Sequence, residues 1–407
     1  MHRGALVALA FSIVLGGLIG AGKRRLIELH ETLPNPRSLS TIAAPAGGGP
    51  LAEALLPSTP YMYSGAAATA GGPVRPLCFQ LWGRPSANVV VYFAGLVGSR
   101  LEHFGAPSSE HFVLTIDRPG LGCSPAWEEG ASPSAGARRT TRYTDVADVV
   151  LGLLRTLGVD GFSTVGWSSG GPFALALAHQ AGHAPVSGTP RLLRTSTVAS
   201  DPHWASMSAL ELVRAPLSGL LVCAVRCLPR RVVGFAAGRI VEALAGIELG
   251  VATRWGADRE RQRGAPSRFI INLAEGLRQR GASELAVAGE MALERAREWG
   301  FQFDDLVRAE SPAHAAPVLV LHSPADRAVP YAAALQLKSR LRGATLYRMP
   351  PYATGTAEGE GHSIMERHWE LIVGAAAVEG GDINGIDPQL RADMEVPVVK
   401  RSWWSYI

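Results

Sequence analysis

Cysteine is scarce in this chain. Four residues, Cys78, Cys123, Cys223 and Cys227, are spread over 407 positions. So few and so scattered, they exclude a disulfide-dense scaffold, and no second Cys/His pair accompanies Cys223 and Cys227 as a structural zinc site would require. We therefore expect the four cysteines to be small apolar filling residues, with Cys223 and Cys227 on one face of a helix.

Charged residues are also few, at 18% of the chain against 47% hydrophobic residues. This balance excludes general disorder and allows a large core, so we expect one large domain with an insertion rather than three small ones. The formal net charge is +4, and the excess is spread over many arginines with no accompanying nucleic-acid motif. We interpret it as a slightly basic, solvated surface and expect no nucleic-acid partner.

The one long apolar run lies at the N-terminus. Residues 4–22 are uncharged and strongly apolar, and Lys23-Arg24-Arg25 follows directly. The run is just long enough to cross a hydrocarbon core of roughly 30 Å. We expect residues 1–25 to be an uncleaved membrane anchor, with the catalytic domain on the cytoplasmic side; a cleaved secretory signal and an organelle-targeting presequence are the alternatives.

The rest of the chain divides by composition. Residues 26–73 are rich in Pro, Gly, Ala and Ser and suggest a linker. Apolar strand-like runs then alternate with helical spacing, which predicts a mostly parallel sheet flanked by helices over 74–203 and 312–380. Residues 204–311 have a helical pattern with interspersed arginines, which suggests an inserted cap. We expect residues 381–407 to form a C-terminal tail. The expected elements of the core are the strands Leu77–Trp82, Asn88–Phe93, Phe112–Ile116, Phe162–Val165, Leu193–Ala199, Val318–His322 and Thr345–Met349, and a helix over Asp145–Leu157 capped by Thr144.

One pentapeptide carries the strongest functional signal. Residues 166–170 read Gly-Trp-Ser-Ser-Gly, between an apolar strand and a helix of small residues. A serine in a sharp strand-to-helix turn has its hydroxyl lifted clear of the sheet, and the flanking glycines prevent clashes in that turn. We therefore expect Ser168 to be a nucleophile. A carboxylate nucleophile, as dehalogenases and epoxide hydrolases use, is excluded at this position.

A serine hydroxyl needs a base to take its proton and an acid to orient that base. Asp326 follows an apolar strand, at the sheet edge where catalytic groups gather in parallel sheets. His362 follows the next expected strand on a glycine-flanked loop. The order Ser, Asp, His predicts a triad of Ser168, Asp326 and His362. Asp201, after an earlier strand, is an alternative acid, and other histidines lie near loops: His103, His314 and His322.

These motifs resemble the α/β-hydrolase superfamily, in the broad group of proline-iminopeptidase-like and haloperoxidase-like esterases. Residues 166–170, 117–124 (Asp-Arg-Pro-Gly-Leu-Gly-Cys-Ser), the Asp326 loop ending in Val-Pro, Gly361-His362 and residues 299–301 (Trp-Gly-Phe) match independently. The resemblance implies an α/β-hydrolase fold with an inserted helical cap, and an oxyanion hole formed by the backbone amides of Leu96 and Ser169. The chain departs from the family where a His-Gly pair is common, because Ala94 occupies the histidine position.

Together the residues and the resemblance predict a serine hydrolase that acts on an ester, in particular a lipid-like acyl substrate, and needs no metal or organic cofactor. The same triad would serve an aminopeptidase, an amidase or an acyltransferase. A non-catalytic, membrane-tethered binding protein of the same fold is a further alternative. We expect the cap to set the substrate, since function depends on the site rather than on the fold.

Overall fold

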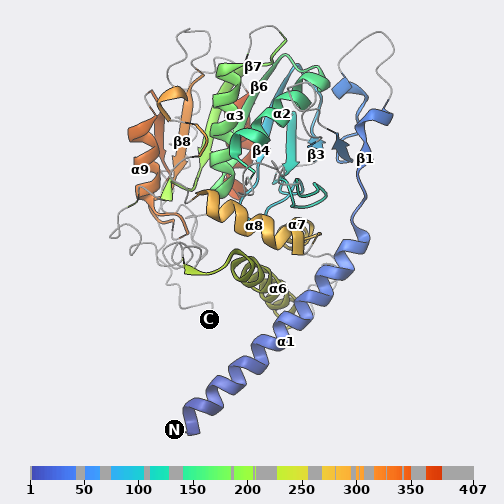
Figure 1. The fold of residues 1–407 in the computed structure, drawn as a ribbon, viewed down its shortest axis with the longest axis vertical. Helices are drawn as coiled ribbons and strands as arrows, with labels where there is room; N and C mark the ends of the chain where they lie inside the picture. The colour runs from blue at the N-terminus through green and yellow to red at the C-terminus, as the bar shows by residue number, and fades with distance from the viewer. Residues whose placement is uncertain are drawn as a thin grey trace, which may run out of the picture.

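The computed structural model describes sixteen parts of the chain (Figure 1). They are residues 2–42, 51–64, 75–104, 111–127, 141–184, 188–204, 207, 227–254, 268–279, 281–294, 299–301, 303–306, 316–326, 328–341, 343–349 and 364–377. Cys223, His314, His362 and the expected tail over 381–407 lie outside these parts.

A sheet of nine described strands forms the centre of the molecule (Figure 1). Its strand order is β1-β2-β3-β5-β4-β6-β7-β8-β9, and every pair from β5 to β9 is parallel. β3 is antiparallel to both of its neighbours. The mostly parallel sheet expected from the sequence is therefore confirmed. The strands are β1 (Arg37–Ser38), β2 (Pro60–Tyr63), β3 (Leu77–Trp82), β4 (Asn88–Phe93), β5 (Val113–Asp117), β6 (Gly161–Trp167), β7 (Arg191–Val198), β8 (Val318–His322) and β9 (Thr345–Arg348).

The segment expected to be a linker contributes to the fold. The N-terminal helix α1 runs from His2 to Thr32, and β1 and β2 extend the antiparallel edge of the sheet between short 3-10 turns, η1 (Leu39–Thr41) and η2 (Leu51–Ala54). Tyr61 of β2 is buried in the core, so the Pro- and Gly-rich composition concealed two strands of the sheet. Among the residues that the structure describes, no helix has both the length and the apolar character needed to cross a membrane.

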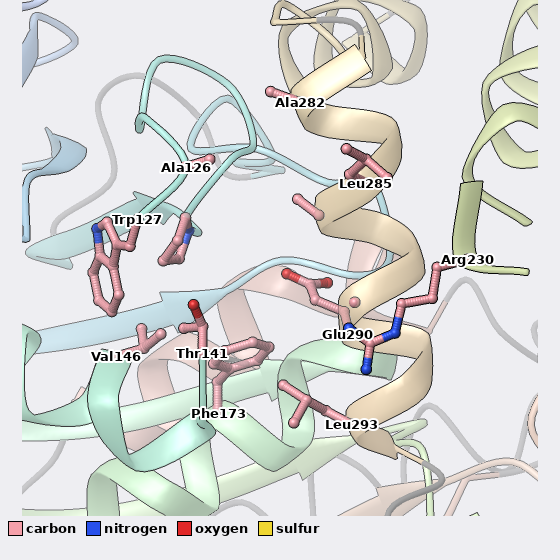
Figure 2. Close-up of a pocket in the computed structure, with 13 residues that line it drawn as sticks. Ala126, Trp127, Thr141, Val146, Phe173, Arg230, Ala282, Leu285, Glu290 and Leu293 are labelled. Carbon is pink, nitrogen blue, oxygen red and sulfur yellow. The ribbon is translucent and has the colours of Figure 1, made fainter. Parts of the chain in front are cut away.

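The inserted region is helical, as the sequence predicts. It contains α6 (Arg230–Arg254), α7 (Arg268–Gly276), α8 (Gly281–Glu294) and the 3-10 turn η6 (Phe303–Leu306). The three helices share a hydrophobic cluster with α1 and with Val97 and Leu121 from the loops of the sheet. α8 lies across the loop that follows β5 (Figure 2). The cap is thus packed onto the edge of the sheet where the parallel strands end.

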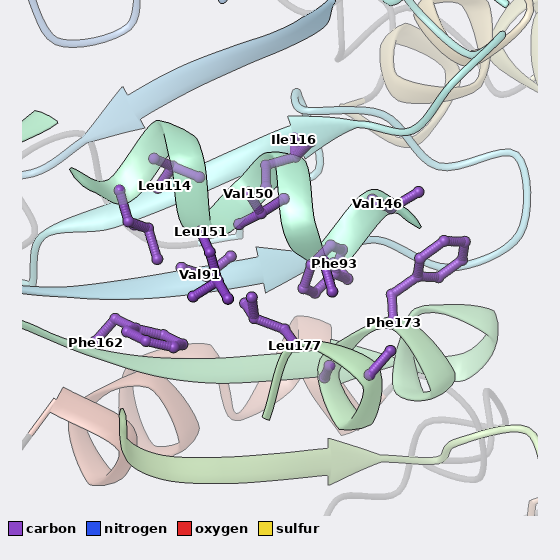
Figure 3. Packing of buried hydrophobic residues seen from close by; sticks show 14 of the residues in the cluster. Val91, Phe93, Leu114, Ile116, Val146, Val150, Leu151, Phe162, Phe173 and Leu177 are labelled. Atoms are coloured by element: carbon purple, nitrogen blue, oxygen red, sulfur yellow. The ribbon is translucent and has the colours of Figure 1, made fainter. Parts of the chain in front are cut away.

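Helices cover both faces of the sheet. α2 (Tyr143–Leu157), α3 (Gly171–His183) and α9 (Tyr331–Arg340) pack on one face, and α10 (Ile364–Arg367) and α11 (Trp369–Ala377) pack on the other. Side chains alternate between the two faces of a strand, so Val91 and Phe93 of β4 join the first cluster (Figure 3) and Val90 and Tyr92 join the second. Both faces of β4 are buried, which explains its continuous apolar run.

The start of α2 differs from the sequence prediction by two residues. Arg142, rather than Thr144, is the N-cap residue, and its backbone N–H donates to the carboxylate of Asp145 at 2.8 Å. A carboxylate in the first turn satisfies a backbone donor and interacts favourably with the helix dipole.

Two cysteines correct the expectation that all four are filling residues. Cys78 on β3 and Cys123 in the loop after β5 form a disulfide with a Cα–Cα distance of 5.6 Å. The 45-residue separation corresponds to a stabilisation of about 4 kcal/mol in the chain-entropy account. The sequence could not reveal the pair, because only the antiparallel pairing of β3 with β5 brings the two cysteines together. Cys227 is free and exposed.

Candidate active site

The turn after β6 has the geometry of a nucleophile elbow. Ser168 has φ of 53°, in the left-handed region that only glycine adopts easily. A Cβ atom at Gly166 would overlap the carbonyl of Gly170, and one at Gly170 would overlap the carbonyl of Phe93. Both glycines are therefore required for the turn to close. The predicted elbow is present, with Ser168 at its strained position.

Strained backbone is concentrated at this edge of the sheet. Among the described non-glycine residues with positive φ, Val97, Ser168 and Ala199 follow the ends of β4, β6 and β7, which are adjacent strands. For Val97 the conformation is especially unfavourable, because a β-branched residue crowds its own backbone at φ of 63°. Such strain persists only where the surrounding structure enforces it, and it is typical of functional sites.

The loop expected to supply one oxyanion donor lies beside Ser168. A Cβ atom placed on Gly95 would be 3.5 Å from the Cβ of Ser168. The N–H of Gly98 donates to the Gly95 carbonyl at 2.8 Å, so residues 95–98 form a tight turn. Leu96, within that turn, is half-buried, and Ser169 is buried. The structure thus brings the segment carrying Leu96 next to the elbow carrying Ser168 and Ser169.

Two charged side chains hold this loop where the family commonly has a histidine. Glu102 Oε1 accepts the N–H of Gly95 at 3.0 Å and the hydroxyl of Tyr92 at 2.8 Å. Arg118 donates to the carbonyl of Gly95 at 2.7 Å and also to the carbonyl of Ala94. Neither residue was predicted to have a role. Their position in the fold shows that they fix the backbone of Ala94 and Gly95.

The cap also holds this loop in place through hydrogen bonds. Asn272 of α7 donates from Nδ2 to Glu102 Oε2 at 2.6 Å, and its Oδ1 accepts the N–H and the hydroxyl of Ser99 at 2.8 and 2.7 Å. Burial raises the pKa of Glu102, and the hydrogen bonds from Gly95, Tyr92 and Asn272 oppose that rise. Both oxygens of the Glu102 carboxylate therefore accept hydrogen bonds.

A second buried network, of hydrogen bonds and ion pairs, also supports this turn. Asp117 accepts the N–H of Arg100 at 2.6 Å and the N–H of Cys123 at 2.9 Å. The Arg100 guanidinium forms ion pairs with Asp117 at 2.5 Å and with Glu275 of α7. Burial raises the pKa of Asp117, and the charge of Arg100 counteracts it. Asp117 therefore braces the turn through its hydrogen bonds and its ion pair.

The hydrogen bond between Glu102 and Asn272 can be tested by exchanging the carboxylate and the amide between the two residues. We expect this bond to hold the loop in its active position. In Glu102→Gln the new amide N–H₂ would face the Asn272 amide, so two donors would meet and the loop would shift. Because a displacement of about 1 Å can cost about a hundredfold in rate, kcat should fall by about that factor with KM little changed. The double variant Glu102→Gln/Asn272→Asp restores a donor-to-acceptor pair and should recover most of kcat. Ester hydrolysis kinetics on the three proteins measure this; a double variant no better than the single one would contradict it.

The predicted acid, Asp326, lies in the loop after β8 and is buried. Its Oδ1 accepts the N–H groups of Ala328 and Val329 at 2.8 and 2.9 Å. His322 lies below it, with Nε2 3.0 Å from the Val329 carbonyl and 3.6 Å from Asp326 Oδ2. His322 therefore supports the Asp326 loop. His362, the predicted base, lies outside the described residues.

The alternative acid, Asp201, lies against the elbow itself. Its Oδ2 accepts the hydroxyl of Ser169 at 2.7 Å, and its N–H donates to the Ser168 carbonyl at 3.2 Å. These contacts connect the end of β7 to the nucleophile turn. His103, another histidine considered from the sequence, stacks on Trp82 with ring centroids 4.5 Å apart and packs edge-on against Trp369. Its contacts are those of a core side chain.

Three neighbouring residues are of types that can ligate a metal ion, but their contacts give them a structural role. The ligand atoms of Cys78, Asp117 and Cys123 lie within 4.8 Å of one another. The two sulfurs are joined to each other, and the Asp117 carboxylate already accepts hydrogen bonds from Arg100 and Cys123. These residues therefore stabilise the loop after β5.

A family model agrees with this architecture. Residues 88–213 match a family model described as the alpha/beta hydrolase fold, and no curated protein matches the sequence. Similar solved structures include a hydrolase from Pseudomonas aeruginosa PA01, with 17% identity over 80% of this chain and 99% of that one and a TM-score of 0.46. The esterase EaEST from Exiguobacterium antarcticum has 13% identity, coverage of 77% and 96%, and a TM-score of 0.46. A bromoperoxidase from Bacillus anthracis has 14% identity, coverage of 78% and 100%, and a TM-score of 0.46.

Two findings agree on the fold. The matched residues contain β4, β5, β6 and β7 with the elbow at Ser168, and the sheet continues with the strand order and helical layers that the sequence led us to expect. The chain has the α/β-hydrolase fold, and its residues 88–213 match the family model of that description.

Proposed function

We propose that the protein is a serine hydrolase that cleaves esters through Ser168. The observation that carries this proposal is the position of Ser168: a strained serine between two obligatory glycines, with the Gly95–Gly98 turn alongside. A turn that merely connected β6 to α3 would have no need of a non-glycine residue in that conformation. Strain at a serine that faces an amide-bearing loop is the arrangement that acyl transfer requires.

The proposed reaction has two half-reactions, acylation of Ser168 and hydrolysis of the acyl-enzyme. Ser168 Oγ attacks the ester carbonyl carbon while His362 takes its proton, and Asp326 orients His362 and stabilises the imidazolium. The amides of Leu96 and Ser169 donate to the developing oxyanion. The carbon–oxygen bond to the leaving group breaks, and the alcohol departs with the proton from His362. Water then attacks the acyl-enzyme with His362 as base, which releases the acid and regenerates Ser168.

The residues that hold the loop beside Ser168 support acyl transfer as the reaction. The oxyanion loop is fixed by Glu102, Arg118 and Asn272 before any substrate is present, and preorganised donors are the largest contribution to catalysis of acyl transfer. We propose a lipid-like acyl group because helices with exposed apolar residues form the cap.

Covalent labelling tests the proposal directly. A fluorophosphonate probe reacts with an activated serine, and mass spectrometry of the digested protein locates the adduct. We expect one adduct on Ser168, together with hydrolysis of p-nitrophenyl esters that the probe abolishes. The neighbouring Ser169 provides an internal control, since its hydroxyl donates to Asp201 and should stay unmodified. An unlabelled wild-type protein, or an adduct on Ser169, would overturn the assignment.

We also propose that the protein associates with a membrane surface through residues 4–22. Supporting this, α1 packs closely on α6, where a Cβ atom at Gly246 would overlap the carbonyl of Leu18. α6 also carries exposed apolar side chains, among them Phe235, Ile240 and Leu244. The full-length protein should bind phospholipid vesicles in a flotation assay, and a variant lacking residues 1–25 should bind less; equal binding by both would refute the proposed role of residues 4–22.

A further inference from the structure

A pocket of about 260 Å³ lies between the cap helix α8 and the sheet domain (Figure 2). Ser168, Ser169, Leu96 and Asp326 are not among the described residues that line it, so it is distinct from the predicted catalytic residues. Its volume is below the roughly 300–1,000 Å³ of pockets that hold drug-sized ligands. It suits a smaller molecule.

Most of the lining is apolar and comes from two walls. On one side, Ala282, Leu285, Ala286, Gly289 and Leu293 line the pocket from α8. Their spacing of three and four residues places them on one face of the helix. On the other side are Trp127, Val146 and Phe173 (Figure 2). An apolar ligand body would be covered from both directions.

One charged group interrupts this apolar lining. Glu290 is 7% exposed, and Figure 2 shows its carboxylate pointing away from α8 into the pocket. Its Oε1 accepts from Arg118 Nε at 2.8 Å, whereas its buried Oε2 accepts no hydrogen bond from the described residues. A buried carboxylate oxygen without a donor is costly. Burial accordingly raises the pKa of Glu290, and a ligand that brings a donor would satisfy this oxygen.

Charge decides which donor fits. The negative charge of Glu290 is already paired with Arg118, and the exposed Arg230 adds a positive charge at the rim. Because one negative and two positive side chains surround the pocket, it has no excess negative charge to favour an ammonium group, and a neutral hydroxyl is sufficient to donate to Oε2. We propose that this pocket binds a small neutral alcohol, whose apolar body lies between α8 and Phe173 and whose hydroxyl donates to Glu290 Oε2.

The chain offers a substitution that fills the pocket without a clash. Gly289 lines the pocket, and a Cβ atom there would have nothing within 4 Å. Leucine at this position therefore projects into the empty volume, and it also favours the helix more than glycine does. Gly182 is the matched control, because it is an exposed helical glycine of α3 with equally open surroundings and lies outside the pocket.

Benzyl alcohol is a suitable probe, with toluene and benzylamine as analogues that lack the hydroxyl or replace it with an ammonium group. Titrations of the full-length protein followed by saturation-transfer NMR should show saturable binding of benzyl alcohol. Toluene should bind at least about tenfold more weakly, as a lost hydrogen bond to a charged group predicts. Benzylamine should also bind at least about tenfold more weakly, because its positive charge would lie near two arginines. Gly289→Leu should weaken benzyl alcohol binding at least tenfold, and Gly182→Leu should not change it.

A further variant separates the hydroxyl contact from filling of the pocket. In Glu290→Gln the group facing the pocket can be an amide N–H₂, so the preference for benzyl alcohol over toluene should shrink to less than about threefold. Near-UV circular dichroism confirms that each variant is folded. Absence of saturable binding to the wild type, unchanged binding in folded Gly289→Leu, or equal affinities of the wild type for benzyl alcohol and toluene would each overturn the proposal. These measurements read binding alone, so they are independent of catalysis by Ser168.

Discussion

Ser168→Ala should lower kcat for p-nitrophenyl ester hydrolysis by about a millionfold, to the level left by binding and the oxyanion amides alone. That is the scale on which removal of the nucleophile acts in a serine hydrolase, where the triad works as a unit. Alanine lacks the attacking oxygen and keeps the backbone of the turn. Steady-state kinetics on the purified variant measure the loss, and residual activity above about one per cent of the wild type would show that another residue is the nucleophile.

Two further variants make this result specific. Ser169→Ala should retain activity within about tenfold, because Ser169 is assigned its backbone amide and its hydroxyl only braces Asp201. Ser168→Gly should be as inactive as Ser168→Ala but more stable by about 1 kcal/mol, since glycine adopts φ of 53° without strain. Urea unfolding of the two inactive variants measures that difference. Equal stabilities would show that the elbow stores no strain.

Asp326→Asn should lower kcat by about ten thousandfold, the size of effect seen when an orienting aspartate is replaced by its amide. The asparagine oxygen can still accept the N–H groups of Ala328 and Val329, so the loop should keep its shape. The new N–H₂ would donate toward His362 and stabilise the wrong tautomer of the imidazole. The loss should therefore appear in kcat while thermal stability changes little.

The same substitution at Asp201 is the matched comparison. Asp201 accepts the Ser169 hydroxyl and donates its N–H to the Ser168 carbonyl, and asparagine can preserve both contacts. Asp201→Asn should therefore stay within about tenfold of the wild type. If the ranking of the two variants is reversed, Asp201 is the acid of the triad and Asp326 only shapes its own loop.

The sequence predicted those parts of the molecule that depend on local patterns. β3 and β4 begin and end where their apolar runs do, and the elbow could be placed because its glycines and its serine lie within five residues. The Pro- and Gly-rich stretch hid β2, since a four-residue strand has no periodicity to detect and forms only by pairing with β1 and β3. Local sequence does not show such pairing.

The residues that hold the loop beside Ser168 could not be predicted from the sequence for a related reason. Arg118 stands in a motif that the sequence analysis quoted, but its partner Glu290 is 172 residues away in the cap. Glu102 has no neighbouring signal, and its partner Asn272 is 170 residues away. A buried charge is tolerated only when its partners are in place, and those partners follow from the complete fold. The disulfide between Cys78 and Cys123 was missed in the same way.

Arg118 connects three parts of the molecule through one side chain. It is paired with Glu290 on α8, it donates to the carbonyls of the turn beside Ser168, and its guanidinium lies 5.3 Å from the ring centroid of Phe173 on α3. Lifting α8 would leave a buried arginine without its counter-ion, so the hydrogen bonds that fix the turn would weaken together with the cap contact. The position of the cap helix α8 and the geometry of the turn beside Ser168 therefore depend on the same buried side chain.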